Sequence, residues 1–353
     1  AARGLALRIR RDGRRLVQTL KAAPATGGLA FDRAEWEVRL TTPAPDLTAF
    51  GDPRVLERTG LVLPDELAPV FETRIRRETL MVEWPDGRTA PAVVELAFDS
   101  GTIAAGARKL PVAEHEHELK ERDEAALFAL AETLATVAPL AIERRDKAAR
   151  GYELATGRSV PPRKAGKLRL AADCDVETGL RTILRSGLTH WLDNEPAARD
   201  GRDPEGVHQL RVALRRLRSA LGIFAELLAP SVRVRWNEEL RWLLQVLGPA
   251  RDLDVLIGEL LPPVAAAPAL AGLTEALAEV AAAQRAEAYD ALRAALDGER
   301  YARLGLGLAA WIERRGWREG VDVDVLVAQR QPVRGLAARM LTRRHRQALK
   351  RGR

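Results

Sequence analysis

The sequence predicts an α+β protein of more than one domain, in which an N-terminal antiparallel β-barrel with flanking helices precedes an all-α helical bundle. Three observations lead to this fold class. The 353 residues, 46% of them hydrophobic, exceed one ordinary domain and can bury a sizeable core. Over most of residues 1–120 apolar and polar residues alternate with the period of a strand. After Asp123 the apolar residues recur with the period of a helix instead.

Short strands separated by turn residues account for the N-terminal part. We expect strands at residues 5–10, 16–21, 36–40, 71–84, 93–98, 102–103 and 113–120. Asp12-Gly13 predicts a hairpin turn, and Pro85-Asp86-Gly87 and Asp99-Ser100-Gly101 predict two further turns. Between the third and fourth strands, a segment with four prolines predicts loop with a short helix. Six or more antiparallel strands with such short connections indicate a meander or a closed barrel.

The helical part divides into two flanking helices, a linker and a bundle. We expect the flanking helices at residues 123–137 and 142–152. Glycines, prolines and cations follow, which is the composition of a linker. The bundle helices are expected at residues 175–194, 204–229, 231–247, 250–260, 268–296, 299–316 and 333–350, and only Val321–Val327 has the period of a strand there. The predicted organisation is a first domain at 1–155, a linker at 156–172 and a second domain at 173–353.

The charge balance points to a polyanionic partner. There are 56 Lys and Arg against 49 Asp and Glu, a net charge of +7, and cations gathered in patches attract nucleic acid, anionic lipid or condensed phosphate. Aromatic residues are only 5% of the chain, which supplies few platforms for stacking bases. A nucleic-acid binder therefore rests on basicity alone, and phosphate without bases is the better hypothesis.

Cysteine usage and hydropathy place the protein in the cytoplasm. Cys174 is the only cysteine, which excludes a disulfide framework and a multi-cysteine metal site. No apolar run approaches the ~20 residues that span a bilayer, and no secretory signal is visible.

Each predicted strand carries charge along one face. Arg8 and Arg10 share a face, as do Glu35 and Glu37, because side chains two residues apart point the same way. The other such sets are Thr19 and Lys21, Arg33 and Arg39, Glu95 and Asp99, and Glu114, Glu116, Glu118 and Lys120. In one interpretation these are solvated outer faces with ordinary cross-strand ion pairs. In the other they line a barrel, where cations neutralise a phosphate chain and carboxylates hold divalent cations that promote hydrolysis of a phosphoanhydride.

Several of these segments resemble the CYTH domain of triphosphate tunnel metalloenzymes. Glu114-His115-Glu116-His117-Glu118-Leu119-Lys120 resembles the last barrel strand of that family. Asp146-Lys147-Ala148-Ala149-Arg150-Gly151-Tyr152 resembles its closing Ser-Lys-x-x-Arg-Gly-Tyr segment, with Asp146 in place of Ser. Leu7–Arg10, Thr19–Lys21 and Arg33–Glu37 resemble its early strands, so that the resemblance covers residues 1–155.

The resemblance implies an eight-stranded barrel that binds triphosphate and hydrolyses or cyclises it with Mg²⁺ or Mn²⁺. The residues that we expect to bind phosphate are cations of the strands and the closing segment, namely Arg8, Arg10, Lys21, Arg33, Arg76, Arg77, Lys120, Lys147 and Arg150. The expected metal ligands are the glutamates Glu35, Glu37, Glu114, Glu116 and Glu118.

Two features depart from the CYTH pattern. The family opens with a Glu-x-Glu-x-Lys strand, and the chain starts after it, so we expect the first strand to lie upstream in a longer protein. His115 and His117 stand where the family has apolar residues, and their alternation with the glutamates predicts that they face away from the metal ligands.

The helical part carries a basic face of its own. In the segment that follows Asp203-Pro204, His208, Arg211, Arg215 and Arg218 fall within one arc of a helix, beside a leucine stripe. A solvated basic face is the alternative interpretation. This segment and Trp242–Val255 resemble the CHAD domain, an all-helical fold of two similar halves that binds inorganic polyphosphate; the chain holds mainly the first half. The residues that we expect to bind polyphosphate are His208, Arg211, Arg215, Arg216, Arg218 and Arg251, with Asp252 and Asp254 bracing arginines or capping a helix.

These features together predict a metal-dependent inorganic triphosphatase that hydrolyses tripolyphosphate to diphosphate and phosphate, with a helical domain that binds polyphosphate. The alternative is a non-catalytic polyphosphate-binding protein. The expected partners are triphosphate and polyphosphate, neither membrane nor nucleic acid, and a homo-oligomer is left open. An association with polyphosphate granules in the cytoplasm would follow.

Overall fold

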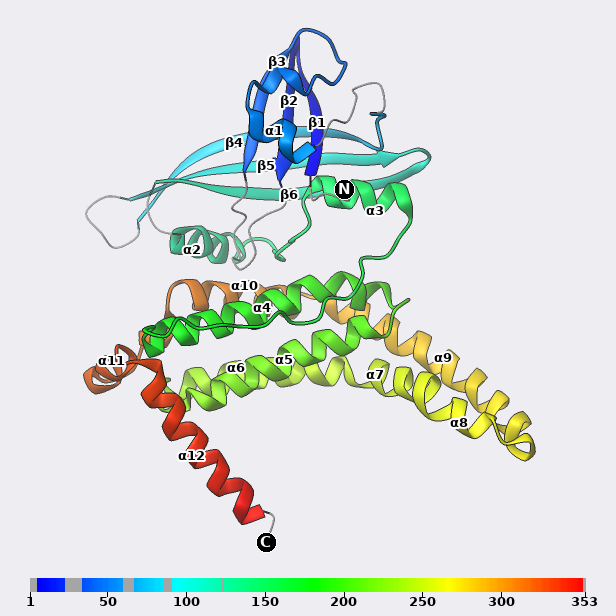
Figure 1. The fold of residues 1–353 in the computed structure, drawn as a ribbon, viewed down its shortest axis with the longest axis vertical. Helices are drawn as coiled ribbons and strands as arrows, with labels where there is room; N and C mark the ends of the chain where they lie inside the picture. Colours follow the sequence, from blue (N-terminus) through cyan, green and yellow to red (C-terminus); the bar gives the residue numbers. More distant parts are fainter. Residues whose placement is uncertain (1–4, 23–33, 60–66, 86–90, 122–123, 352–353) are drawn as a thin grey trace. The chain divides into compact units, whose positions relative to one another are not determined.

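The computed structural model describes residues 5–22, 34–59, 67–85, 91–121 and 124–351 (Figure 1). They form two compact units. The first unit comprises Ala1–Val82, Glu95–Glu118 and Arg145–Arg158, and the second comprises Glu83–Val94, Leu119–Arg144 and Ser159–Arg353. The chain is therefore β-rich in its N-terminal part and helical in its C-terminal part, as the sequence predicts.

One sheet of the first unit is built from strands β1 (Leu5–Asp12), β2 (Arg15–Ala22) and β3 (Glu35–Leu40), paired antiparallel in that order. Gly13 lies at a turn with φ +57°, a conformation that favours glycine, so the predicted Asp-Gly hairpin is confirmed. The register places Thr19 opposite both Arg8 and Glu37. These side chains consequently share one face of the sheet.

A second sheet contains β4 (Glu72–Trp84), β5 (Ala92–Ala105) and β6 (Arg108–Glu121), again in chain order. The predicted turn at Asp99-Ser100-Gly101 is wrong, because β5 runs through it without a break. A Cβ on Gly101 would lie 1.9 Å from the carbonyl oxygen of Arg74. Glycine is therefore needed here for close approach of two strands, and not for a turn.

The closed barrel is not confirmed. The six described strands form two separate three-stranded sheets, and within the described ranges no strand pairing joins one sheet to the other. Short antiparallel connections predict neighbouring strands well, but closure depends on pairing between strands distant in sequence. The predicted short helix of the proline-rich segment is present as α1 (Pro53–Thr59), preceded by a 3₁₀ turn at Thr48–Phe50.

Helix α3 (Lys147–Thr156) belongs to the first unit and begins later than predicted. Its start is fixed by Asp146, whose carboxylate accepts a hydrogen bond from the Ala149 amide at 2.8 Å. Gly151 is buried against Phe71, where a Cβ would lie 2.4 Å from the ring. Tyr152 packs edge-on against the same ring, with centroids 5.2 Å apart. These contacts fix the helix beside the start of β4.

The second unit is a bundle around α4 (Val176–Asp200) and α5 (Glu205–Ile223). Its other helices are α2 (Ala125–Leu134), α6 (Pro230–Val246), α7 (Gly248–Val255), α8 (Leu261–Ala265), α9 (Ala271–Leu296), α10 (Glu299–Glu313), α11 (Val323–Gln329) and α12 (Val333–Arg351). A π-helical turn at Leu256–Leu260 joins α7 to α8. Leucines at helical spacing, Leu180, Leu184 and Leu188 of α4 and Leu210, Leu214 and Leu217 of α5, are almost wholly buried and form the core.

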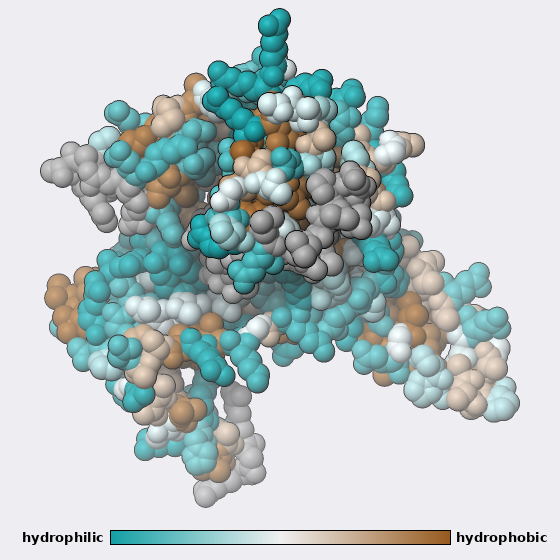
Figure 2. Space-filling model, turned by 45° about the horizontal axis from the view of Figure 1, so that its top comes forward, coloured by the Kyte–Doolittle hydropathy of each residue, from teal (hydrophilic) through white to brown (hydrophobic). Residues whose placement is uncertain are grey.

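Two predictions for this unit need correction. The strand period of Val321–Val327 is wrong, because α11 occupies that segment, and a short apolar run fits either period. Helix α4 extends past the predicted end at residue 194 to Asp200 and contains Pro196. None of the described helices combines the length and apolarity that a bilayer crossing requires. The face shown in Figure 2 is largely hydrophilic, with smaller hydrophobic areas between.

Candidate phosphate and metal site

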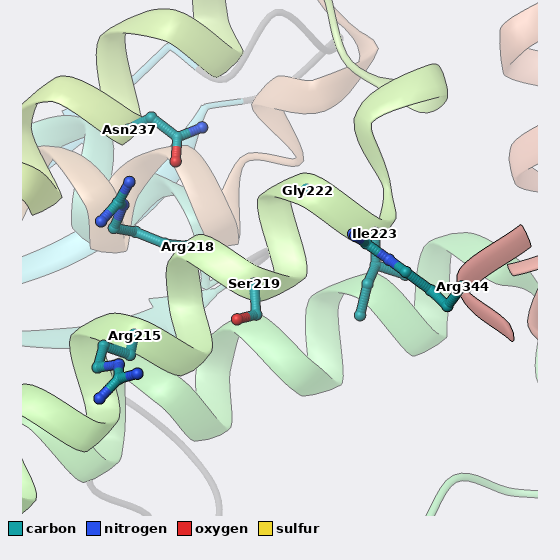
Figure 3. Close-up of a pocket in the computed structure, with 7 residues that line it drawn as sticks. All are labelled: Arg215, Arg218, Ser219, Gly222, Ile223, Asn237 and Arg344. Atoms are coloured by element: carbon teal, nitrogen blue, oxygen red, sulfur yellow. The ribbon is translucent and has the colours of Figure 1, made fainter. Parts of the chain in front are cut away.

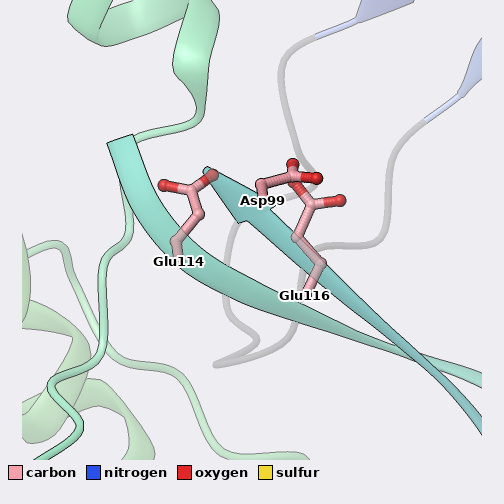
Figure 4. A group of neighbouring side chains, drawn as sticks. All are labelled: Asp99, Glu114 and Glu116. Carbon is pink, nitrogen blue, oxygen red and sulfur yellow. The ribbon is translucent and has the colours of Figure 1, made fainter. Parts of the chain in front are cut away.

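Three carboxylates gather on neighbouring strands of the β4–β5–β6 sheet. Asp99 projects from β5, and Glu114 and Glu116 project from β6 on the same face (Figure 4). One oxygen from each of the three lies within 4.8 Å of the others, and a group with this geometry could hold a metal ion. The Asp99 side chain is fully buried, whereas half of the Glu116 side chain is exposed. The group therefore opens to one side.

Three cations interleave with these carboxylates. Arg77 of β4 donates to both oxygens of Asp99, at 2.7 and 2.6 Å, and to Glu116 at 2.7 Å. The Lys147 ammonium lies 2.6 Å from Asp99 and 2.7 Å from Glu116, and it also contacts Glu114. Arg150, one turn further along α3, donates to Glu114. We call these six residues the charged cluster; their formal charges cancel.

Burial and charge have opposite effects on the acids of the charged cluster. Burial alone would raise the pKa of Asp99, but hydrogen bonds from Arg77 and Lys147 outweigh it and hold that pKa below its ordinary value. The same competition lowers the pKa of Glu116, with Lys147 as the main partner. Burial would lower the pKa of Lys147, yet the three carboxylates raise it. The site is consequently fully ionised at neutral pH.

The donor set fits a hard divalent cation and a phosphate chain. Carboxylate oxygens are the ligands that Mg²⁺ and Mn²⁺ prefer, and guanidinium and ammonium groups bind phosphate oxygens. The Nε atoms of Arg150 and Arg8 are buried, and no described residue accepts a hydrogen bond from either. Buried donors of this kind normally have a partner, and a phosphate oxygen would supply one.

The other predicted residues of the first unit lie outside the charged cluster. On the β1–β2–β3 sheet, Glu35 pairs with Lys21 at 2.8 Å, and Glu37 accepts from Thr19 at 2.9 Å and lies 3.7 Å from Arg8. Burial lowers the pKa of Arg8, and neighbouring Arg10 lowers it further. Arg77 also acts electrostatically on Arg8. These residues therefore form a second charged face in the same unit.

Four further expectations have different outcomes. Arg76 alternates with Arg77 along β4 and pairs with Glu78 at 2.8 Å, with four fifths of its side chain exposed. Glu118 and Lys120 lie further along β6 and are not part of the carboxylate group. Arg33 lies outside the described residues.

Asp99 is the residue that the sequence interpretation missed as a ligand. Its spacing from Glu95 placed it on a charged face, but the Asp-Ser-Gly sequence indicated a turn. Extending the period-two pattern of β5 through residue 99 would have found it.

The helical unit contains an arginine-rich pocket of about 510 Å³. It is lined by Arg215, Arg218, Ser219, Gly222 and Ile223 of α5, Asn237 of α6 and Arg344 of α12 (Figure 3). No carboxylate is among these residues, which we call the arginine pocket. The Nε of Arg218 is buried, and among the described residues nothing accepts its hydrogen bond. The arrangement suits an anion with several oxygens.

Two predicted polyphosphate-binding residues, Arg215 and Arg218, line this pocket, and four do not. Arg211 donates to the Leu244 carbonyl at 2.9 Å, and Arg251 pairs with Glu259 at 3.0 Å. His208 is half-buried on α5, and Arg216 is exposed. Burial lowers the pKa of Arg211, and Arg215 and Arg251 are among the charges that act on it.

Asn237 and Arg344 were not foreseen as pocket residues, because only the packing of α6 and α12 brings them to α5. The expected bracing role of the acids is present at Asp254. This buried carboxylate accepts from Arg285 at 2.7 Å and from the Tyr289 hydroxyl at 2.9 Å.

Comparison with known proteins finds both families whose resemblance the sequence carries. The CYTH domain family matches residues 1–152, and the CHAD domain family matches residues 182–353. An inorganic triphosphatase from Haemophilus influenzae (strain ATCC 51907 / DSM 11121 / KW20 / Rd) is 30% identical over 154 residues, 44% of this chain and 42% of that protein. The chain thus spans less than half the length of this relative. The crystal structure of the CHAD domain from the plant Ricinus communis is 33% identical, covering 54% of this chain and 60% of that chain with a TM-score of 0.44.

Proposed function

The chain contains a CYTH domain at residues 1–152 followed by a CHAD domain at residues 182–353, and from this premise we propose that it is a metal-dependent inorganic triphosphatase that also binds polyphosphate. The charged cluster carries the proposal. Its three carboxylates and three cations lie on one face, where one set matches a divalent cation and the other a triphosphate. The similarity to an inorganic triphosphatase supports the same reaction.

In this proposal Asp99, Glu114 and Glu116 hold Mg²⁺ or Mn²⁺. The bound ion supplies Lewis-acid polarisation of phosphoryl oxygens and neutralises charge that develops on them. Glu35 and Glu37 face Lys21 and Arg8 across the other sheet, and we retain them as proposed contributors from that side.

Arg77, Lys147 and Arg150 bind and orient the phosphate chain. With no ligand present they are bound to the carboxylates, so a triphosphate and its cation would exchange partners with them: phosphate oxygens for the cations, metal for the carboxylates. Such an exchange keeps every charge paired at each stage. Water then attacks the terminal phosphorus, the phosphoanhydride bond breaks, and phosphate and diphosphate are released.

Phosphate release from tripolyphosphate by the whole protein, with Mg²⁺ or Mn²⁺ and with a chelator, tests this function. We expect release only when a divalent cation is present. Release that is unaffected by the chelator, or no release with either metal, would contradict the proposal.

The second part of the proposal assigns condensed phosphate to the arginine pocket. Arg215, Arg218 and Arg344 offer fixed positive charge without a compensating acid, and Asn237 offers an amide donor. Helix α12 extends this surface, because Arg339, Arg343, Arg346 and Lys350 line a second pocket of about 630 Å³. Binding of long chains there would bring the enzyme to polyphosphate granules in the cytoplasm. A protein without turnover would retain this binding, which is the second candidate function.

A further inference from the structure

The face of β6 opposite the charged cluster carries a pair of histidines. The Nδ1 of His115 lies 3.2 Å from the Nε2 of His117, and the two rings are stacked with centroids 5.4 Å apart. Phe98 of the neighbouring strand β5 packs against His115, with centroids 5.5 Å apart. Both imidazoles are half-buried, so they are restrained yet open to solvent.

Two imidazole nitrogens at this distance cannot direct lone pairs at each other unless something positive lies between them. A neutral imidazole has one N–H donor and one acceptor nitrogen, so a proton on either ring meets this need. A metal ion meets it equally well. In a tetrahedral site with metal–nitrogen bonds of about 2.0–2.1 Å, two ligand nitrogens lie roughly 3.3 Å apart. The observed 3.2 Å fits both arrangements.

We propose that His115 and His117 form a second metal site, for a borderline divalent cation such as Zn²⁺ or Ni²⁺, with water completing the coordination. Imidazole suits these ions, whereas Mg²⁺ prefers oxygen ligands. The site is therefore distinct in chemistry from the carboxylates on the other face. The ring that donates in the metal-free pair shifts its proton to its other nitrogen when the ion binds, so no net proton is released.

Calorimetric titration of the whole protein with Zn²⁺, in the presence of excess Mg²⁺ to occupy the carboxylates, tests this site. We expect His115→Gln and His117→Gln each to weaken Zn²⁺ binding at least about tenfold, the smallest loss typical of a perturbed metal site. Two matched controls should leave Zn²⁺ binding unchanged: His345→Gln on exposed α12, and Glu116→Gln on the opposite face of β6.

X-ray absorption of the Zn²⁺-loaded, unsubstituted protein gives a second measurement that needs no variant. Two imidazole nitrogens in the zinc shell are the expected result, and an all-oxygen shell would overturn the proposal. Zn²⁺ binding lost in Glu116→Gln but kept in both histidine variants would overturn it as well. Neither measurement involves phosphate release, so the triphosphatase proposal can fail without affecting this one.

Discussion

At the scale of single residues, the charged cluster depends on alternation along β6. Glu114 and Glu116 point to one face and meet Lys147, while His115 between them points to the other and meets Phe98. A shift of one residue would exchange these two surfaces. The chemistry of the site therefore depends on the register of a single strand.

Glu116→Gln should reduce metal-dependent phosphate release from tripolyphosphate at least about 100-fold, because an amide is a much weaker ligand for a hard cation than a carboxylate. Steady-state assays with Mg²⁺ and Mn²⁺ provide the measurement. Glu72→Gln is the matched control, since Glu72 is exposed on β4 and pairs only with Arg74 among the described contacts. Equal turnover of Glu116→Gln and the unsubstituted protein would remove the cluster as the metal site.

Asp99→Asn should destabilise the protein at pH 7 by about 1–3 kcal/mol, the range for hydrogen bonds to charged groups, because Arg77 and Lys147 lose a buried anion. The folded state holds the pKa of Asp99 below its ordinary value, so the stabilisation is complete above that value. It is lost as the pH falls through the folded-state pKa, below about 4.

Thermal unfolding between pH 7 and pH 2 would show this dependence. The unsubstituted protein should lose stability steeply at the acid end, and Asp99→Asn should lose less. Asp290→Asn, on the exposed side of α9, serves as a control with the pH profile of the unsubstituted protein. Identical profiles for Asp99→Asn and the unsubstituted protein would show that Asp99 does not contribute.

At the scale of elements, α3 positions two of the three cations. Lys147 and Arg150 are three residues apart and so share a face of the helix, and the Asp146 cap determines where that helix begins. Gly151 lets the helix approach Phe71. Sequence patterning located this segment correctly but placed its start several residues too early, because the cap was not recognised.

Asp146→Ala should cost about 0.5–2 kcal/mol through loss of the cap and should also lower kcat/KM for tripolyphosphate, since the first turn carries Lys147. Asp146→Ser should restore both properties, because a serine hydroxyl accepts the same hydrogen bond. Chemical denaturation and steady-state kinetics measure the two effects. Full activity of Asp146→Ala would show that the cap does not position Lys147.

Helix α5 supplies two arginines to the arginine pocket, and Arg215→Ala with Arg218→Ala should weaken binding of long-chain polyphosphate. The slope of log affinity against log salt should become shallower by roughly one for each phosphate that the variant no longer neutralises. Arg303→Ala, exposed on α10, controls for the change in net charge. A salt titration with an unchanged slope, or a preference for duplex DNA, would contradict the assignment.

At the scale of the whole molecule, the two proposed sites lie in different units. We expect their effects to separate: Glu116→Gln should keep its affinity for polyphosphate within about twofold, and the Arg215→Ala, Arg218→Ala protein should keep its kcat for tripolyphosphate, because well-separated sites behave additively. Measuring both properties on both variants tests this. Loss of kcat in the arginine variant would show that the sites are coupled.

The sequence by itself determined the fold class, the β-to-α order and most helices, because hydrophobic period and turn residues are local properties of the chain. It also identified Glu114, Glu116, Lys147 and Arg150, since alternation and helical spacing place them on common faces. Tertiary structure decided what local patterns cannot encode. Asp99 joins the carboxylates only because β5 continues past a turn-like sequence, and Arg344 meets Arg218 only because α12 packs near α5. Whether a sheet closes into a barrel likewise depends on pairing between distant strands, which the period of any one strand does not specify.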